Sequence, residues 1–143
     1  MALLAMAALV ATVNLPEMHR RYVVESETRQ LKSFIGSLPS MARDNNTALF
    51  VSWDGTNRRF RISTDLAATN VLDTFNLDDG ITITGPANAV LRCDLLGRAF
   101  VGASTNMMTA VETITLDHQS SSASTPAFRI SLTPLWTISV DQV

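Results

Sequence analysis

The sequence has little of what metal sites, disulfides and nucleic-acid binding require. Cys93 is the only cysteine, which excludes an intrachain disulfide and a cysteine-rich zinc site, and we expect it to be a buried thiol. His19 and His118 are the only histidines, and neither has metal-ligand spacing to a second His or Cys, so we expect both at the surface. The net charge is -2 and the basic residues are spread along the chain. No strong electrostatic footprint for nucleic acid or acidic membranes is therefore visible.

Three short motifs resemble binding sites, but two of them lack essential members. Asp78-Asp79-Gly80 resembles part of a calcium loop without its remaining ligands, so a type I′ or related turn is the better interpretation. Gly97 to Gly102 has the glycine spacing of a phosphate loop, but Ala103 and Ser104 stand where Lys and Ser/Thr should follow, which indicates a strand edged by turns. Asn45-Asn46-Thr47 matches a glycosylation sequon at Asn45. No triad, dyad or metal cluster is evident, so we expect neither an enzyme nor a cofactor.

Charge is also absent from the start of the chain. Met1 to Val13 contains no charged residue, no Gly and no Pro, and is rich in the helix formers Ala and Leu. A helix that is apolar on all sides must lie in a core, a bilayer or an assembly of like helices. From Met1 to Leu15 it would span about 22 Å, short of the roughly 20 residues that a bilayer core needs. Either the segment spans poorly or residues have been removed before Met1.

A secretory signal peptide is an alternative interpretation of this apolar segment. Such peptides carry an apolar stretch of similar length, although the usual basic region is missing here. The chain would then be a secreted β-rich binding module with an N-terminal export signal. Mass spectrometry of the native protein separates the two hypotheses, because the module would lose everything before about Pro16.

The helical pattern continues downstream with an amphipathic character. Apolar or small residues recur with steps of four and three at Val24, Thr28, Leu31, Ile35, Leu38 and Ala42. The polar residues between them predict a solvated face formed by Glu25, Glu27, Arg29, Gln30, Lys32 and Ser33. Pro16 predicts a kink or a short unwound stretch near Val13 to Glu17. We place the helix end between Leu38 and Asn45, since Gly36 and Pro39 disfavour a longer helix.

After Asn46 the pattern alternates and turn residues recur, which indicates strands. Ala48 to Trp53 and Arg58 to Ser63 flank the turn Asp54 to Asn57, as in a β-hairpin with a four-residue loop. Further predicted strands are Ile81 to Thr84, Ala89 to Cys93, Ala99 to Val101, Glu112 to Asp117, Ala127 to Leu132 and Trp136 to Asp141. Ser120 to Pro126 is expected to be a flexible or exposed loop.

These elements predict an α+β fold, with one long N-terminal helix packed on an antiparallel β-sheet domain. The helix is apolar in its first half and amphipathic in its second. We divide the chain into an assembly or membrane helix, 1–45, and an antiparallel β head, 46–143.

The basic clusters are Arg20-Arg21 and the hairpin arginines Arg58, Arg59 and Arg61. The hairpin arginines beside Phe60 could touch a nucleic-acid backbone. The favoured interpretation is that they keep the outer face of the hairpin soluble and pair with acids on neighbouring copies.

The order of these features resembles a known family. The apolar helix ends in Leu15-Pro16, the amphipathic part continues to Met41-Ala42-Arg43, and the strand Ala48 to Trp53 follows. Matching segments further along are Leu77 to Ile81, Leu91 to Ala99, Thr113 to Leu116 and Phe128 to Leu132. Together they are similar to type IV pilin-like proteins, especially the minor pseudopilins of type II secretion systems and the related minor pilins of type IV pili.

The sequence departs from the family pattern in three places. The Gly-containing processing site with its glutamate is not present, Pro16 lies several residues closer to the start, and Cys93 alone cannot form the C-terminal disulfide loop of many major pilins. Met1 is then the residue exposed by an atypical cleavage, or the chain has an earlier beginning.

The resemblance implies a structural subunit that waits in the inner membrane and is then lifted into a helical filament at the cell surface or in a periplasmic pseudopilus. Its partners would be copies of itself or related pilins and the inner-membrane assembly machinery, with no cofactor and no nucleic acid. Met1 would be the processed and methylated terminus, and Pro16 would let the helix bend as copies stack. Filament-core packing would fall to Leu3, Leu4, Met6, Leu9, Val10 and Val13. Intersubunit ion pairs would involve Glu17, Arg20, Arg21, Glu25 and Glu27.

Overall fold

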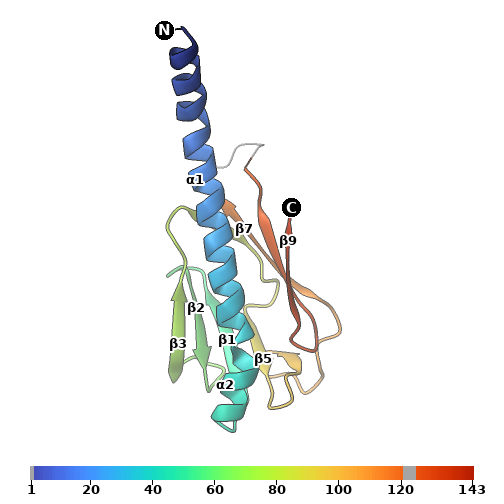
Figure 1. Cartoon of the computed structure of the whole chain (residues 1–143). Coiled ribbons are helices and arrows are strands. Elements are labelled where there is room, and N and C mark those ends of the chain that lie inside the picture. Colours follow the sequence, from blue (N-terminus) through green and yellow to red (C-terminus); the bar gives the residue numbers. More distant parts are fainter. Residues whose placement is uncertain (1, 121–124) are drawn as a thin grey trace.

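One long helix and two antiparallel sheets make up the molecule (Figure 1). The computed structural model describes residues 2–120 and 125–143, and of residues 2–14 it describes the backbone alone. Helix α1 spans Ala2–Gly36 and the short helix α2 spans Leu38–Asp44. The strands are β1 Leu49–Asp54, β2 Arg59–Ser63, β3 Val71–Asn76, β4 Ile81–Thr84, β5 Val90–Cys93, β6 Ala99–Val101, β7 Glu112–His118, β8 Phe128–Leu132 and β9 Ile138–Gln142. The N-terminal part of α1 extends beyond the strands, and its C-terminal half lies across them.

Helix α1 is continuous through Pro16. A proline inside a helix removes one backbone hydrogen bond, and the remaining ladder carries the helix across the gap, so the unwound stretch expected near Val13 to Glu17 is wrong. The kink itself stays a prediction. The helical hydrogen-bonding pattern is interrupted at Ser37, which separates α1 from α2. Pro39 lies in the first turn of α2, where a backbone N–H would have no partner within the helix, so its absence has no cost. The helical region ends at Asp44, as expected.

The strands form two sheets, whereas the sequence predicted one. The five-stranded sheet has the order β3-β2-β1-β5-β6 and the four-stranded sheet the order β4-β7-β8-β9, with antiparallel pairing throughout. The α+β class is confirmed. Strand β3 was not predicted, because its residues are mostly exposed and do not alternate.

The predicted hairpin exists with its loop shifted by one residue. Asp54 pairs with Arg59 at the end of the two strands, so Asp54 belongs to β1 and the loop runs from Gly55 to Arg58. The Asp54 carboxylate accepts hydrogen bonds from the Asn57 backbone N–H at 3.2 Å and from its side-chain amide at 2.8 Å. In β2, Phe60 and Ile62 are buried while Arg59 and Arg61 are partly exposed, as the alternation predicted.

The amphipathic half of α1 continues into α2 and supplies one wall of the core. All the predicted inward positions are buried: Val24, Thr28, Leu31, Ile35, Leu38 and Ala42. Thr28 satisfies its hydroxyl by donating to the Val24 carbonyl at 2.7 Å. On the predicted solvated face, Glu25 and Glu27 are half-buried. The exposed residues of this face are Arg29, Gln30, Lys32 and Ser33.

Strands from both sheets supply the rest of this core. The indole Nε1 of Trp136 donates to the Ile35 carbonyl at 2.9 Å and ties the β8–β9 turn to the end of α1. Trp136 itself lies before β9 and has φ 56°, which is why the strand begins two residues later than predicted. Residues 24–42 and both sheets therefore share one core, while the division into 1–45 and 46–143 stays a prediction.

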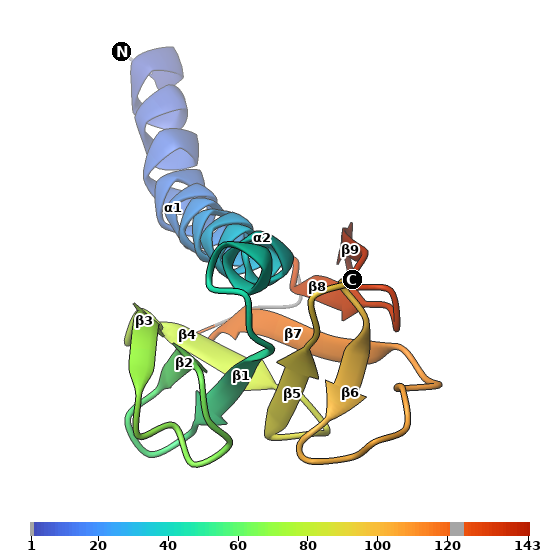
Figure 2. The same cartoon turned by 90° about the horizontal axis from the view of Figure 1, so that it is seen from below.

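Contacts across the sheet boundary hold the two sheets together. The Ala99 N–H of β6 donates at 2.8 Å to the carbonyl of Pro134, which lies between β8 and β9. The buried Glu112 carboxylate accepts from the backbone N–H groups of Ala87 and Asn88 and from the Asn88 side-chain amide. Seen along α1, both helices lie on the same side of the strands, with β3 and β9 on opposite sides of α1 (Figure 2).

Candidate functional site

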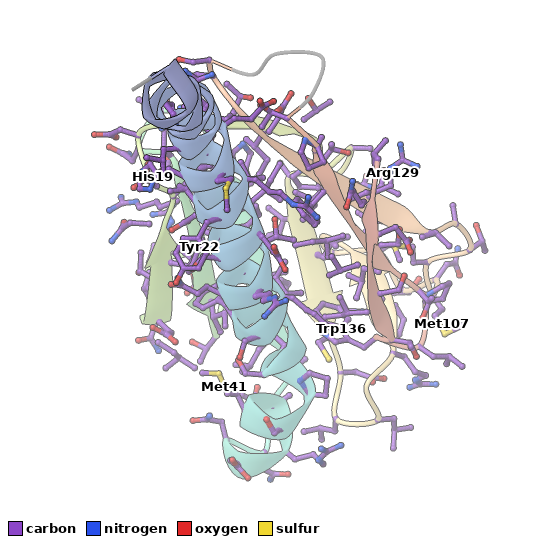
Figure 3. The ribbon with its side chains drawn as sticks, turned by 45° about the horizontal axis from the view of Figure 1, so that its top comes forward. His19, Tyr22, Met41, Met107, Arg129 and Trp136 are labelled. Atoms are coloured by element: carbon purple, nitrogen blue, oxygen red, sulfur yellow. The ribbon has the colours of Figure 1, made fainter. Side chains whose placement is uncertain are left out.

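Helix α1 carries an exposed apolar stripe. Leu15, Met18 and Tyr22 are 61%, 66% and 70% exposed. Their spacing of three and four residues places them on one face of the helix. This face is roughly opposite the one that carries Val24 and Leu31 into the core. We call Leu15, Met18 and Tyr22 the helix stripe (Tyr22 is labelled in Figure 3).

The helix stripe lies where α1 leaves the head, next to the segment that is apolar on all sides in the sequence. Large apolar side chains exposed together on a helix mark an interaction surface. The sequence carried a signal for it, the step from Leu15 to Met18 to Tyr22, which the prediction did not use. The stripe is therefore a candidate interaction surface that the sequence reasoning missed.

The residues predicted to form filament-core contacts lie N-terminal to the stripe. Leu3, Leu4, Met6, Leu9, Val10 and Val13 are in the helical backbone of α1, and their side chains lie outside the described part. Met1 also lies outside it, as do residues 121–124 of the expected loop Ser120 to Pro126. Within the residues that the structure describes, no helix is both long and apolar enough to cross a membrane.

Most of the residues predicted to form intersubunit ion pairs have contacts within the chain. The Glu25 carboxylate and Arg29 guanidinium lie 2.6 Å apart, and Arg20 donates to the Ser120 carbonyl at 3.2 Å. Glu27 accepts a 3.5 Å hydrogen bond from the Asp78 N–H, and its burial raises the pKa of its carboxyl group. These contacts orient the side chains on α1, while pairing between subunits stays a prediction.

Arg21 is exposed on α1, and Glu17 also interacts with other groups of the chain.

The hairpin arginines also find partners in their own chain. Arg59 and Arg61 approach the Asp54 carboxylate at 3.3 and 3.7 Å, and Arg58 donates to the carbonyls of Asp78 and Ile81. Arg59 and Arg61 thus have Asp54 as a partner within the chain, while pairing with acids on neighbouring copies stays a prediction. Hydrogen bonds from Asn57, followed by Arg59, lower the pKa of the Asp54 carboxyl.

The histidines and the cysteine do not converge on a site. His19 is exposed on α1, and His118 is half-buried at the end of β7, where its Nδ1 accepts from the Ser120 N–H at 3.0 Å. Cys93 is fully buried, as expected, and burial, with a smaller contribution from Asp94, raises its pKa to about 12. Among the described residues, no group of three or more His, Cys, Asp and Glu could hold a metal ion.

The three short motifs have structural explanations. Asp78 begins a turn: its carbonyl accepts a hydrogen bond from the Ile81 N–H, and its carboxylate accepts one from the Gly80 N–H. Neither Asp79 nor Gly80 has the positive φ that a type I′ turn requires. Type I′ is thus wrong, although the turn is confirmed. Gly97 and Gly102, with φ 74° and 50°, flank strand β6 as predicted. Asn45 of the sequon is exposed, and its use stays a prediction.

A small apolar cavity lies between the sheets. Its volume of about 20 Å³ has room for roughly one water molecule. Trp53, Phe60 and Leu91 are among its lining residues, and Glu112 is its only acidic one. This volume is far below the roughly 300–1,000 Å³ of small-molecule sites.

A larger hollow lies between α1 and the four-stranded sheet. It is an open groove of about 300 Å³. Its lining residues are Glu25, Thr28, Arg29, Lys32, Phe128, Val140 and Gln142, and we call it the α1–β9 groove. The sequence could not reveal it, because its residues come from both ends of the chain and meet only in the folded head.

The fold is similar to that of several solved structures. The type IV minor pilin FimU of Pseudomonas aeruginosa strain PAO1 superposes with a TM-score of 0.63 at 13% identity, covering 82% of this chain and 91% of that chain. A second crystal form of FimU gives 0.65 at 12% identity, with 85% and 90% covered. The minor pseudopilin EpsH from the type 2 secretion system of Vibrio cholerae gives 0.59 at 12% identity, with 83% and 96% covered.

These similarities show that the chain has the fold of minor pilins and minor pseudopilins, and they confirm the fold that the sequence resemblance implied. No protein-family model and no curated protein matches the sequence. At such low identity the shared feature is the fold: a long helix whose C-terminal half packs on antiparallel strands.

Proposed function

We propose that this chain is a structural subunit, a pilin or pseudopilin, of a type IV pilus-like or type II secretion filament. The observation that carries the proposal is the helix stripe, which lies on a helix that extends beyond the head. Burying three large side chains against neighbouring helices is favourable by roughly 25 cal/mol for each Å² of apolar surface removed from water. The similarity of the fold to minor pilins and pseudopilins supports the same role.

In this function α1 assembles the filament and the sheets form its outer surface. The subunit is held in the inner membrane by its apolar N-terminal segment before assembly. The assembly machinery then lifts it into a cell-surface or periplasmic filament. Leu9, Val10 and their apolar neighbours exchange lipid for close-packed helix contacts. The role is structural, and no catalytic step is assigned to the chain.

The test is to place a charge on the helix stripe in cells that assemble the filament. Met18→Glu should abolish filaments seen by electron microscopy, because a carboxylate would be buried between helices without a partner. The side chain is exposed in the monomer, so the fold should persist. Thr56→Glu at the exposed hairpin tip is the matched control and should leave filament yield unchanged.

Leu9→Lys tests the segment N-terminal to the stripe in the same assay. Its expected result is also a loss of filaments. A folded Met18→Glu protein that assembles at the parental yield would overturn the proposed function.

A further inference from the structure

The two flanks of the head differ in charge. On the β3 side, Asp73, Asp78 and Asp79 are exposed, and Glu27 lies beside Asp78. The nearby cations only partly offset them: Arg58 donates to backbone carbonyls, and Arg59 and Arg61 approach Asp54. We call the edge strand β3 with Asp78 and Asp79 the acidic flank.

The α1–β9 groove lies on the other flank and is positive. Its charged lining residues are Glu25, Arg29 and Lys32, and Glu25 already pairs with Arg29 at 2.6 Å. Lys32 is exposed and leaves an excess of one positive charge. Asp141 alternates to the other face of β9, opposite Arg129, whereas Val140 and Gln142 line the groove.

Apolar surface accompanies the charge on both flanks. Val71 and Leu72 of β3 are each 39% exposed, while in the groove Val140 is half-buried and Phe128 exposes only 8% of its surface. Leu72 lies at an irregularity in the β2–β3 register, and Asp73 follows it. Bulges and charges protect an edge against strand addition. The acidic flank is therefore suited to side-chain docking and not to pairing as an extra strand.

We propose that the acidic flank of one copy docks in the α1–β9 groove of the next copy, with Asp73 facing Lys32 and with Val71 and Leu72 against Val140 and the exposed edge of Phe128. The inference deepens the proposed function and rests on it. Because β3 and β9 lie on opposite sides of α1, the contact joins two different surfaces (Figures 1 and 2). A heterologous contact of this kind can repeat without closing and generates an open helix.

Disulfide cross-linking within assembled filaments tests the contact. Leu72→Cys and Gln142→Cys are introduced together, which should produce a ladder of covalent multimers after mild oxidation. The natural Cys93 does not interfere, because it is fully buried and its raised pKa keeps it protonated. Thr56→Cys with Gln142→Cys is the matched control, since Thr56 is exposed and lies in the β1–β2 loop, at the opposite end of the β2–β3 pair from Leu72.

A charge swap then tests the electrostatic part. In the Leu72→Cys, Gln142→Cys background, Asp73→Lys or Lys32→Glu alone should lower the cross-linked yield about tenfold, because each places like charges opposite one another. The two changes together should restore the ladder. Both positions are exposed, so an unchanged thermal unfolding profile verifies the fold of each variant.

The outcomes separate the two proposals. A ladder that single reversals weaken and the swap restores supports the docking. If filaments form but the Leu72→Cys, Gln142→Cys pair gives no more cross-linking than the control pair, the docking is overturned and the proposed function stands. The same holds if the double charge swap does not restore the ladder. If the parental chain forms no filaments and no ladder, the proposed function fails and the docking fails with it.

Discussion

Two parts of α1 place apolar side chains at helical spacing, and the fold treats them differently. Val24, Leu31 and Ile35 are covered by the two sheets, whereas Leu15, Met18 and Tyr22 lie in solvent although they are comparable in size. Helical spacing identifies an apolar face but does not say what covers it. The first set completes a core within the chain, and the second is the surface that neighbouring helices cover in the proposed function.

The largest contrast is expected from truncating one side chain in each part. Leu31→Ala should lower the free energy of unfolding of the full chain by about 2–5 kcal/mol, because it leaves a cavity in the shared core. Met18→Ala should change it by no more than about 0.5 kcal/mol, since its side chain is already in water. Denaturant titration in detergent measures both, and an equal loss would mean that the stripe is covered within its own chain.

The second prediction uses thiol reactivity as a measure of burial. Cys93, with a pKa of about 12 against an ordinary 9.0, should be alkylated about a thousandfold more slowly at pH 8 than a cysteine placed at exposed Lys32. Mass spectrometry of peptides from Lys32→Cys distinguishes the two thiols in one sample. Comparable labelling rates would show that the core beneath β5 opens readily.

The same thiol gives stability a dependence on pH. The unfolded chain loses the Cys93 proton first, so the free energy of unfolding should fall as pH rises above 9.0 toward about 12. Cys93→Ala should remove this part of the dependence, which denaturant titration at several alkaline pH values can measure.

A smaller effect is expected where the end of α1 is tied to the sheets. Trp136→Phe removes the hydrogen bond to the Ile35 carbonyl and should cost about 1–3 kcal/mol of unfolding free energy. Leu135→Ala, at the exposed neighbouring position, is the control and should be nearly neutral. If both substitutions are neutral, the buried indole contributes little to holding α1 on the head.

The smallest effect belongs to the exposed face of α1. Arg29→Ala removes the ion pair with Glu25 and should cost about 0.3–0.5 kcal/mol, because an exposed pair four residues apart is screened by water and salt. The difference from the parental chain should vanish at 1 M salt, where the Debye length is about 3 Å. A larger, salt-independent loss would mean that Arg29 stabilises α1 through packing.

The sequence predicted most elements where the evidence was local. The inward positions of α1 follow the helical period, and the β1–β2 hairpin follows a turn between alternating strands, so both were confirmed. Strand β3 has no such local signal: Asp73 and Asn76 disfavour strand, and β3 is held by its pairing with β2 and by the packing of Phe75 on Phe34 of α1. The same limit applies to the assignment of β4 to a different sheet from β3 and β5.

The candidate surfaces also differ in whether the local sequence could reveal them. The helix stripe was readable in principle from Leu15, Met18 and Tyr22, because one turn of helix brings such residues together. The partner of the hairpin arginines was not readable, since Asp54 could have faced solvent, a neighbour or Arg59 until the pairing placed it. The α1–β9 groove was not readable either, because it is lined by Lys32 together with residues about a hundred positions away in sequence.

By itself, the sequence determined an apolar helix that its own domain could not enclose, an amphipathic continuation and a series of antiparallel strands. Those properties depend on spacing along the chain and on the chemistry of individual side chains. Only the tertiary structure decided that the strands form two sheets, that one apolar face is buried while the helix stripe is left exposed, and that opposite flanks carry opposite charge. These features arise from long-range pairing and packing, in which residues distant in sequence become neighbours.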